Sequence, residues 1–248
     1  MWNINNIRKE FSDLLRNENF TIDKTGALTV EIIGVQFMAD EPTIFGSVND
    51  DYVKRELQWY ESKSLNVNDI PAKVPEIWKK IATPNGLINS NYGWCIWSKE
   101  NGSQYDGCLR ELICNKNSRR AIMIYTRPSM HEDFCKDGMS DFICTNTVQN
   151  FIRENSMHAI VSMRSNDAWA GYRNDYAWQL HVLKKLLNDY NRLTESNVDL
   201  GHIVWNVGNL HVYSSQFYLI DHFDLTGQHS ISKEEYRKFY PKVRPYAN

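Results

Sequence analysis

The sequence contains no apolar stretch that approaches the roughly 18 residues of a membrane span. Its N-terminal run from Met1 to Glu10 lacks the apolar core of a signal peptide, and the chain has no internal repeat, low-complexity tract or linker. Its 248 residues are 42% hydrophobic, which is enough for a full core, and the length alone allows one large domain or two small ones. We therefore expect a soluble, cytoplasmic protein with a single domain over residues 1–248.

An excess of positive charge is missing too. The formal net charge is −2, so the chain offers no general basic field to nucleic acid. Any phosphate must then be bound by a local cluster of arginines. A polymeric nucleic-acid substrate is disfavoured.

Cysteine is sparse and is not arranged for metal binding. The five cysteines are Cys95, Cys108, Cys114, Cys135 and Cys144. Their number is odd, no two form a Cys-x-x-Cys pair, and none has a histidine nearby at zinc-ligand spacing. We expect a reducing compartment and no metal site.

Three chemically useful groups follow one another in the second half of the chain. Cys144 comes first, although a lone cysteine is usually a small buried apolar residue, because reactivity needs an electropositive, partly open setting. Arg164-Ser165 then ends the alternating run 158–163, as at a strand end where a guanidinium and a hydroxyl bind phosphate. The alternative for Arg164 is a structural ion pair. Asp175 follows as a carboxylate that can read the edge of a base.

The apolar periodicity predicts a single α+β domain with a large mixed sheet. Helices are expected at 7–15, 50–62, around 77–78, 175–194 and 214–223, and strands at 28–38, 120–125, 140–152, 157–163 and 203–212. The segment 126–138 contains Pro128 and Gly138, and its length favours a functional or partner-facing loop.

Glu56 falls in the middle of the helix expected over 50–62, which Asn49 or Asp50 would cap. A mid-helix glutamate usually lies on a solvated face. The bulky neighbours Trp59 and Tyr60 instead favour a carboxylate that points into a pocket.

Many separate blocks along nearly the whole chain resemble the thymidylate synthase superfamily, and within it the deoxycytidylate 5-hydroxymethylases of T-even bacteriophages. They include Asp23-Lys24-Thr25-Gly26, Ala39-Asp40-Glu41-Pro42, Arg55-Glu56-Leu57-Gln58-Trp59-Tyr60, Asn89-Ser90-Asn91-Tyr92-Gly93-Trp94, Ser118-Arg119-Arg120, Ile124 to Met130, Asp141 to Val148, Arg173 to Trp178 and Leu210 to Ser214. The resemblance implies a thymidylate synthase-like domain with helices flanking the sheet, and a homodimer whose sheets pack back to back.

The resemblance also implies an activity. One carbon passes from 5,10-methylenetetrahydrofolate to C5 of deoxycytidylate (dCMP), and water then adds to give 5-hydroxymethyl-dCMP for modified phage DNA. The implied partners are dCMP, folate and a second copy of the chain that shares the active sites, in the host cytoplasm. Docking with other phage nucleotide-synthesis enzymes stays open.

Catalytic roles fall by the same resemblance to Cys144, Glu56, Tyr92 and Asp175. Cys144 is the thiolate that adds to C6 of the base, with its pKa lowered chiefly by Arg164. Glu56 organises water and proton transfers, and Tyr92 serves the C5 proton step. Taken singly, these two residues are more often a helix-face acid and a packing aromatic. Asp175 fits cytosine in either form: a protonated carboxyl donates to N3 and accepts from N4, and a charged one could instead pair with an N3-protonated intermediate.

Substrate-binding roles fall to Lys24, Arg119, Arg120, Arg164, Ser165, Asp175, His211 and Tyr213. Arg164, Ser165 and Lys24 hold the phosphate, and the Arg119-Arg120 pair reaches across from the other subunit. Two alternate residues of one strand, His211 and Tyr213, bind the deoxyribose 3′-hydroxyl, although a satisfied core histidine is the alternative. The folate-contacting positions are Trp78, by stacking, and Asp167, by hydrogen bonds to the pterin.

Three positions and one segment depart from the thymidylate synthase pattern. Ile143-Cys144-Thr145 stands where that family has Pro-Cys-His, Met163 replaces its glutamine before Arg-Ser, and Asp175 replaces its base-reading asparagine. The segment 240–248 lacks the apolar tail that closes over ligands in the synthases. A less sealed site is easier to reconcile with admitting water than with protecting a hydride transfer.

Two alternatives remain. A folate-dependent methylase of dCMP or deoxyuridylate (dUMP) would complete the hydride transfer and release dihydrofolate. A nucleotide- or RNA-binding regulatory protein could keep the fold without the chemistry, but the joint presence of Cys144, Glu56 and Tyr92 argues against it.

Overall fold

The computed structural model describes residues 1–241. The chain folds as two compact units. Unit 1 contains Met1–Val48, Met163–Ala177 and the chain from Val204 onward, and unit 2 contains Asn49–Ser162 and Trp178–Ile203. Whether residues 1–248 form one domain stays a prediction. Most of the C-terminal segment on which the open-site expectation rests, 242–248, lies outside the described residues.

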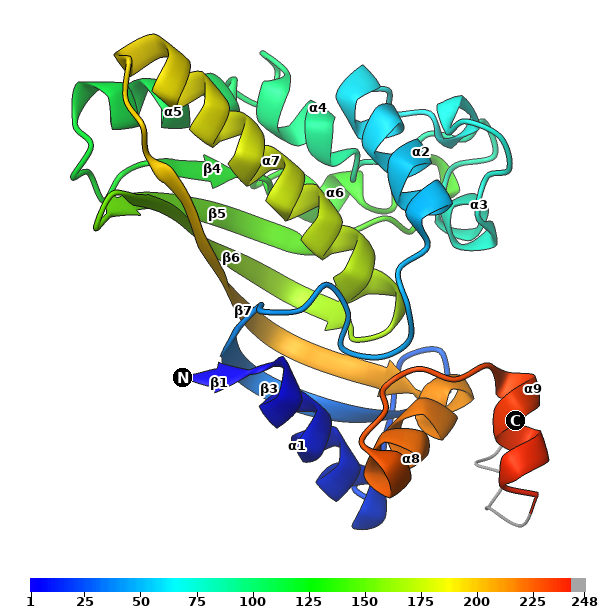
Figure 1. Ribbon diagram of the computed structural model, residues 1–248. Helices are drawn as coiled ribbons and strands as arrows, with labels where there is room; N and C mark the ends of the chain where they lie inside the picture. Colours follow the sequence, from blue (N-terminus) through cyan, green and yellow to red (C-terminus); the bar gives the residue numbers. More distant parts are fainter. Residues whose placement is uncertain (242–248) are drawn as a thin grey trace. The chain divides into compact units, whose positions relative to one another are not determined.

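A mixed seven-stranded sheet organises the fold (Figure 1). Its strands are β1 Trp2–Asn3, β2 Thr21–Ile22, β3 Leu28–Met38, β4 Ile122–Ile124, β5 Thr145–Arg153, β6 Ser156–Asp167 and β7 Asp199–Tyr213. The strand order is β1-β3-β7-β6-β5-β4, and β2 pairs with β3. β1 runs parallel to β3, whereas β7 is antiparallel to β3 and β4 to β5. The expected mixed sheet with flanking helices is confirmed.

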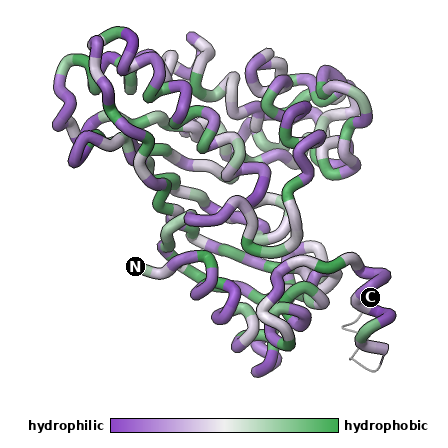
Figure 2. Tube along the Cα trace, viewed as in Figure 1, coloured by the Kyte–Doolittle hydropathy of each residue, from purple (hydrophilic) through white to green (hydrophobic). Residues whose placement is uncertain are grey.

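In unit 1, helix α1 (Ile4–Arg16) packs against β3 and against α8 (Phe217–Thr226), as Figure 1 shows. Hydrophilic and hydrophobic residues alternate along α1 (Figure 2), and its apolar stripe, which includes Ile7 and Phe11, is fully buried. The remaining helical elements of this unit are the 3₁₀ turn η3 Ser214–Gln216 and α9 Lys233–Phe239. The core of unit 1 thus lies between the sheet and these helices.

Unit 2 carries most of the remaining helices. They are α2 Asp50–Ser62, η1 Val67–Asp69, α3 Glu76–Ile81, α4 Tyr92–Trp97, α5 Gln104–Cys114, α6 Met130–Asp133 and η2 Lys136–Gly138. Helix α7, Ala170–Thr194, begins in unit 1 and continues in unit 2. Among the described residues, no helix is both long and apolar enough to cross a membrane.

Several boundaries match the sequence expectations and others differ. β3 and α2 have the expected bounds, and the Asn49 side chain caps α2 by accepting from the Tyr52 amide at 3.0 Å. β5 begins at Thr145 rather than at residue 140, because the backbone before it forms a loop. The segment 126–138 is not a plain loop, since it contains α6 and η2.

Candidate functional site

Cys144 immediately precedes β5, between the fully buried side chains of Ile143 and Thr145. It is half-buried, and its Sγ lies 3.9 Å from the carbonyl oxygen of Phe142. Burial raises the pKa of both Cys95 and Cys108 to about 12, so neither supplies a thiolate at neutral pH. Of these three cysteines, Cys144 alone has the partial exposure that a nucleophile requires.

The loop before Cys144 is fixed by the buried carboxylate of Asp141. Its Oδ2 accepts from the backbone amides of Asn89, at 2.6 Å, and Ser90, at 2.8 Å, and the Ser90 hydroxyl donates to Oδ1. Burial raises the pKa of Asp141, while these donors oppose the shift. The loop that leads to Cys144 is therefore tied to the segment that leads into α4 and Tyr92.

Tyr92 opens α4 and is 4% exposed. Its ring stacks on that of Tyr60 in α2, with centroids 5.3 Å apart. The next residue, Gly93, allows this approach, because a Cβ at that position would overlap the carbonyl oxygen of Tyr60. Tyr92 is thus held firmly against the helix that carries Glu56.

Glu56 lies in the middle of α2 and is 5% exposed, so the carboxylate is buried as expected. Its Oε1 accepts from the Tyr52 hydroxyl at 2.5 Å. Burial raises the pKa of Glu56 to about 7, against the opposing hydrogen bonds of Tyr52, Trp78 and Tyr60. A carboxyl group with this pKa can both accept and donate a proton at neutral pH.

Trp78, the expected folate-stacking residue, lies half-buried in α3. Its Nε1 donates to the Tyr52 hydroxyl oxygen at 3.0 Å, and its ring meets Trp59 edge to face. Trp78 is therefore connected to Glu56 through the Tyr52 hydroxyl. Its stacking on folate stays a prediction.

In unit 1, the proposed phosphate-binding residues stand at the end of β6, as expected. Arg164 is exposed and Ser165 half-buried. Asp167, the expected pterin contact, accepts from the backbone amides of Trp169 at 2.9 Å and Ala170 at 3.2 Å, just where α7 begins. This turn fixes the direction in which the chain leaves the strand.

Asp175 is held by a short chain of side-chain hydrogen bonds within unit 1. Trp205 Nε1 donates to Asn166 Oδ1 at 3.2 Å, and Asn166 Nδ2 donates to Asp175 Oδ2 at 2.7 Å. Because an indole nitrogen can only donate, the amide of Asn166 has one allowed orientation. A Cβ at Gly171 would lie 3.1 Å from Asn166 Nδ2 and 3.7 Å from Asp175 Oδ2, so glycine leaves room for the pair. The hydrogen bond from Asn166 thus fixes the orientation of the Asp175 carboxyl group.

His211 is oriented in a comparable way on β7. Asn209 Nδ2 donates to Glu31 Oε2 at 3.1 Å, which leaves Asn209 Oδ1 to accept from His211 Nδ1 at 2.9 Å. Nδ1 of the neutral imidazole then carries the proton, and Nε2 is an acceptor suited to a hydroxyl donor. The Tyr213 ring packs edge to face against His211, and its hydroxyl helps to lower the pKa of Asp23, after the larger effect of the Thr25 side chain.

The remaining expected site residues are cationic and exposed. Lys24 lies in the turn between β2 and β3. Arg119 is exposed in unit 2. Arg120, whose side chain is 81% exposed, pairs with Glu111 at 3.0 Å. Both arginines thus lie on the surface of unit 2, as a residue that reaches a second subunit must.

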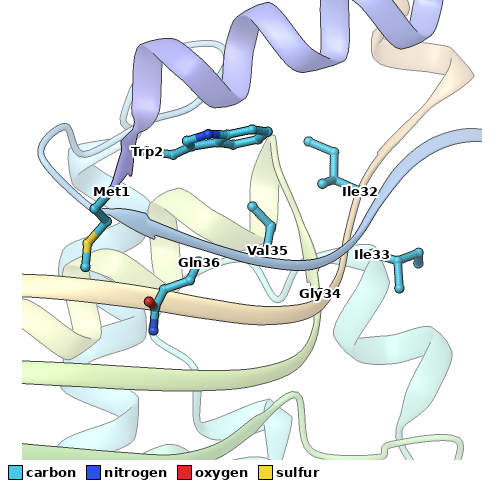
Figure 3. A pocket seen from close by; sticks show the side chains of 7 residues that line it. All are labelled: Met1, Trp2, Ile32, Ile33, Gly34, Val35 and Gln36. Carbon is cyan, nitrogen blue, oxygen red and sulfur yellow. The ribbon is translucent and has the colours of Figure 1, made fainter.

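A separate hollow of about 500 Å³ lies over β1 and β3 in unit 1 (Figure 3). It is lined by Met1, Trp2, Ile32, Ile33, Gly34, Val35 and Gln36. None of these side chains is a nucleophile, an acid or a base. We therefore do not assign the chemistry to this hollow. Within residues 1–241, no group of three or more histidine, cysteine, aspartate or glutamate residues is placed to hold a metal ion.

The fold defines the class of protein first. It is similar to that of the thermostable thymidylate synthase A from Bacillus subtilis, with a TM-score of 0.62 and 23% identity, over 86% of this chain and 82% of that one. The family model described as thymidylate synthase matches residues 8–237. The chain belongs to the thymidylate synthase family.

Within this family, two phage proteins are similar to the chain over most of its length. It is 56% identical over 234 residues to the deoxycytidylate 5-hydroxymethyltransferase of Enterobacteria phage T4, which covers 94% of this chain and 95% of that protein. It is also 56% identical over 235 residues to the enzyme of the same name from Enterobacteria phage T6, covering 94% of this chain and 96% of that protein. The resemblance stated from the sequence blocks is confirmed.

The structure adds residues that the sequence alone did not identify. Tyr52 contacts Glu56, Asn166 contacts Asp175, and Asn209 contacts His211. The first pair has the i,i+4 spacing of one helix face, and the last has the i,i+2 spacing of one strand face, so each pair could have been found from its spacing. The contact of Asn166 depends on the turn into α7 and left no comparable signal.

Proposed function

We propose that this protein transfers a one-carbon unit from 5,10-methylenetetrahydrofolate to C5 of dCMP and hydrates it to 5-hydroxymethyl-dCMP. The observation that carries the choice of dCMP is the carboxyl group of Asp175, held in place by the hydrogen bond that its Oδ2 accepts from Asn166. Such a carboxyl, when protonated, donates to N3 of cytosine and accepts from N4, whereas uracil presents the reverse pattern. The names of the two phage relatives support the same reaction.

Cys144 begins the proposed reaction. Cytosine C5 is a poor nucleophile until a group adds to C6, and a thiolate suits this step because it attacks readily and leaves again. The Cys144 sulfur forms a bond to C6, and the electron pair of the C5–C6 double bond becomes available at C5. C5 then attacks the methylene carbon of the folate, and one of the two bonds that join this carbon to the folate nitrogens breaks.

The following steps need proton transfers and water. The C5 proton is lost, the remaining bond between the methylene carbon and a folate nitrogen breaks, and tetrahydrofolate departs. An exocyclic methylene stays on the base. Water adds to that carbon while the Cys144–C6 bond breaks. Glu56, with its pKa of about 7, suits proton exchange with this water, and Tyr92 serves the loss of the C5 proton.

Recognition of the nucleotide and the folate falls to side chains with no part in bond breaking. We assign the phosphate to Arg164 and Ser165 with help from Lys24, because a guanidinium and a hydroxyl at a strand end form charge-assisted hydrogen bonds. The 3′-hydroxyl donates to Nε2 of His211, and Tyr213 stands beside it. Folate contacts belong to Trp78 and Asp167.

A homodimer with shared sites completes the proposal. Each unit exposes large apolar side chains on its strands, with Trp2 42% and Ile33 70% exposed in unit 1, and Ile124 44% and Leu200 41% exposed in unit 2. A second copy would remove such surface from water. Arg119 and Arg120 would then reach the phosphate bound by the partner.

Mixing two inactive variants tests the shared site. Arg120→Ala removes the reaching group and Cys144→Ser removes the nucleophile, so one of the two sites in a mixed dimer keeps both. Random exchange should restore about a quarter of the parent activity. No recovery despite exchange proven by native mass spectrometry would contradict the shared site.

The proposed activity is tested by incubating the purified protein with dCMP and methylenetetrahydrofolate. We expect a nucleotide heavier by one CH₂O unit and a folate product that stays at the tetrahydrofolate level. A nucleotide heavier by one CH₂ unit, with stoichiometric dihydrofolate, would instead identify a methylase. No product from either dCMP or dUMP would favour a regulatory protein of the same fold.

A further inference from the structure

A three-residue hydrogen-bond chain in unit 2 ends on Glu56. Trp78 of α3 donates from Nε1 to the Tyr52 oxygen at 3.0 Å, and Tyr52 of α2 donates to Glu56 Oε1 at 2.5 Å. Tyr52 and Glu56 are four residues apart, so they share one face of the helix. These hydrogen bonds thus connect α3 to the carboxylate in the middle of α2.

The chemistry of the three groups fixes the direction of both hydrogen bonds. An indole Nε1 carries one hydrogen and cannot accept. The Tyr52 oxygen therefore accepts from Trp78, and its single hydrogen points to Glu56. Oε1 is thus held as the acceptor of the Tyr52 hydrogen bond.

Tyr52 itself stays protonated. Burial and the nearby Glu56 raise the pKa of its hydroxyl far above neutrality. Arg55, whose guanidinium lies 5.4 Å from the centroid of the Tyr52 ring, opposes that shift only in part. The hydroxyl is thus a permanent donor, so it always favours the ionised form of Glu56.

Several side chains around Glu56 affect its pKa, and the effect of Tyr52 can be compared with theirs. Trp78 of α3 and Tyr60 of α2 act on the carboxylate in the same direction as Tyr52, and from α4 Tyr92 reaches Tyr60 by stacking. Of the effects of these side chains that oppose burial, that of Tyr52 is the largest. Removing its hydroxyl should therefore move the titration of Glu56 upward.

We propose that Tyr52 is a positioning residue for Glu56: its hydroxyl, oriented by Trp78, holds Oε1 in place and favours the ionised carboxylate. This inference rests on the proposed function, because Tyr52 is assigned to position Glu56, one of the catalytic residues of that function. It also gives Trp78 a role within the protein that does not depend on folate.

The test is the pH dependence of kcat/KM for dCMP in the Tyr52→Phe variant. Loss of this hydrogen bond to the charged form should move the acidic limb upward by about one pH unit. Activity lost near pH 7 should return at higher pH. Trp78→Phe keeps the Tyr52 hydroxyl but frees its orientation, so the limb should move in the same direction by less.

The matched control is Tyr105→Phe. Tyr105 is another tyrosine of unit 2 whose hydroxyl donates to a carboxylate, Asp189 at 2.7 Å, away from the Glu56 chain. The acidic limb of the kcat/KM profile of the Tyr105→Phe protein should coincide with that of the parent. An unmoved limb in an active, folded Tyr52→Phe protein would overturn the inference, and if that variant does not fold, an unmoved limb in Trp78→Phe would do the same.

A direct titration separates this inference from the proposed function. Carbon-13 glutamate labelling and NMR give the Glu56 pKa without any turnover, with the Glu56→Gln protein identifying the signal. The pKa should rise in Tyr52→Phe even if the parent does not convert dCMP. An inactive parent would overturn the function alone, whereas an unchanged Glu56 pKa would overturn the role of Tyr52 alone.

Discussion

The candidate functional side chains of the two units differ in their burial and in what orients them. In unit 2 Glu56 and Tyr92 are buried beside aromatic rings and Cys144 is half-buried, and burial raises the pKa of Glu56 to about 7 against the opposing hydrogen bonds of its neighbours. In unit 1 the candidate groups are half-buried or exposed, and chains of side-chain hydrogen bonds orient them, as Asn166 does for Asp175. Changes at Cys144, Glu56 and Tyr92 of unit 2 should therefore act on kcat, whereas changes at Asp175 and His211 of unit 1 should act on substrate choice and KM.

The largest effect is expected from the nucleophile in unit 2. Cys144→Ser should lower kcat on the order of 10⁴-fold or more, because an alcohol is barely ionised at neutral pH. Binding of dCMP, measured by calorimetry, should be largely retained. Cys114→Ser, a change at an exposed cysteine, should leave turnover unchanged. Turnover of the Cys144→Ser protein within tenfold of the parent would refute the assignment.

In unit 1, Asp175→Asn should shift base preference without removing the chemistry. Each unpaired buried polar group costs about 1–3 kcal/mol, so the ratio of kcat/KM for dCMP to that for dUMP should fall by several orders of magnitude. Asp224→Asn, an exposed carboxylate of unit 1 paired with Arg16, is the control and should leave the ratio in place. A parent that already prefers dUMP would defeat the assignment of Asp175.

Burial of Glu56 should also appear in stability. Its pKa in the folded protein, about 7, exceeds the ordinary value of 4.5, so the folded state binds more protons between these limits. The free energy of unfolding should therefore fall by about 3 kcal/mol through this group as pH rises from 4.5 to above 7. Glu56→Gln should remove the decrease.

Urea denaturation at several pH values measures this difference. Glu61→Gln changes a carboxylate of the same helix whose side chain is 53% exposed, and its stability curve should follow that of the parent. Parallel curves for the parent and Glu56→Gln proteins would mean that Glu56 ionises in the folded state as easily as in water.

The smallest effect is expected from the support of His211. Asn209→Ala removes the acceptor that fixes the imidazole, at a cost of about 1–1.5 kcal/mol, so KM for dCMP should rise about tenfold with little change in kcat. Asn206→Ala alters an exposed asparagine of the same strand and should leave KM unchanged. A fall in kcat with constant KM would contradict the expected difference between the candidate groups of the two units.

Much of the fold could be predicted from local patterns. The β-branched run of β3 and the Asn49 cap of α2 gave the correct bounds, because the relevant signals lie within those segments. Helix α5 was missed, although it has eleven residues, because polar residues and Gly107 interrupt its apolar pattern. Packing against α4 and β4, rather than local propensity, is what supports it.

The site was predictable to the level of residue types but not of contacts. The burial of Glu56 followed from its bulky neighbours, yet its partner Trp78 is 22 residues away and was assigned only to folate. Likewise, the orientation of Asp175 depends on Trp205, which lies on a strand distant in sequence. Such contacts are set by tertiary packing, which periodicity does not encode.

The origin of the new hydroxyl group tests the central claim most directly. The protein is incubated with dCMP and methylenetetrahydrofolate in water enriched in heavy oxygen, and the nucleotide product is weighed by mass spectrometry. Water addition to an exocyclic methylene predicts a hydroxymethyl nucleotide that carries the heavy isotope, together with tetrahydrofolate. A product without solvent oxygen, accompanied by dihydrofolate, would contradict the account.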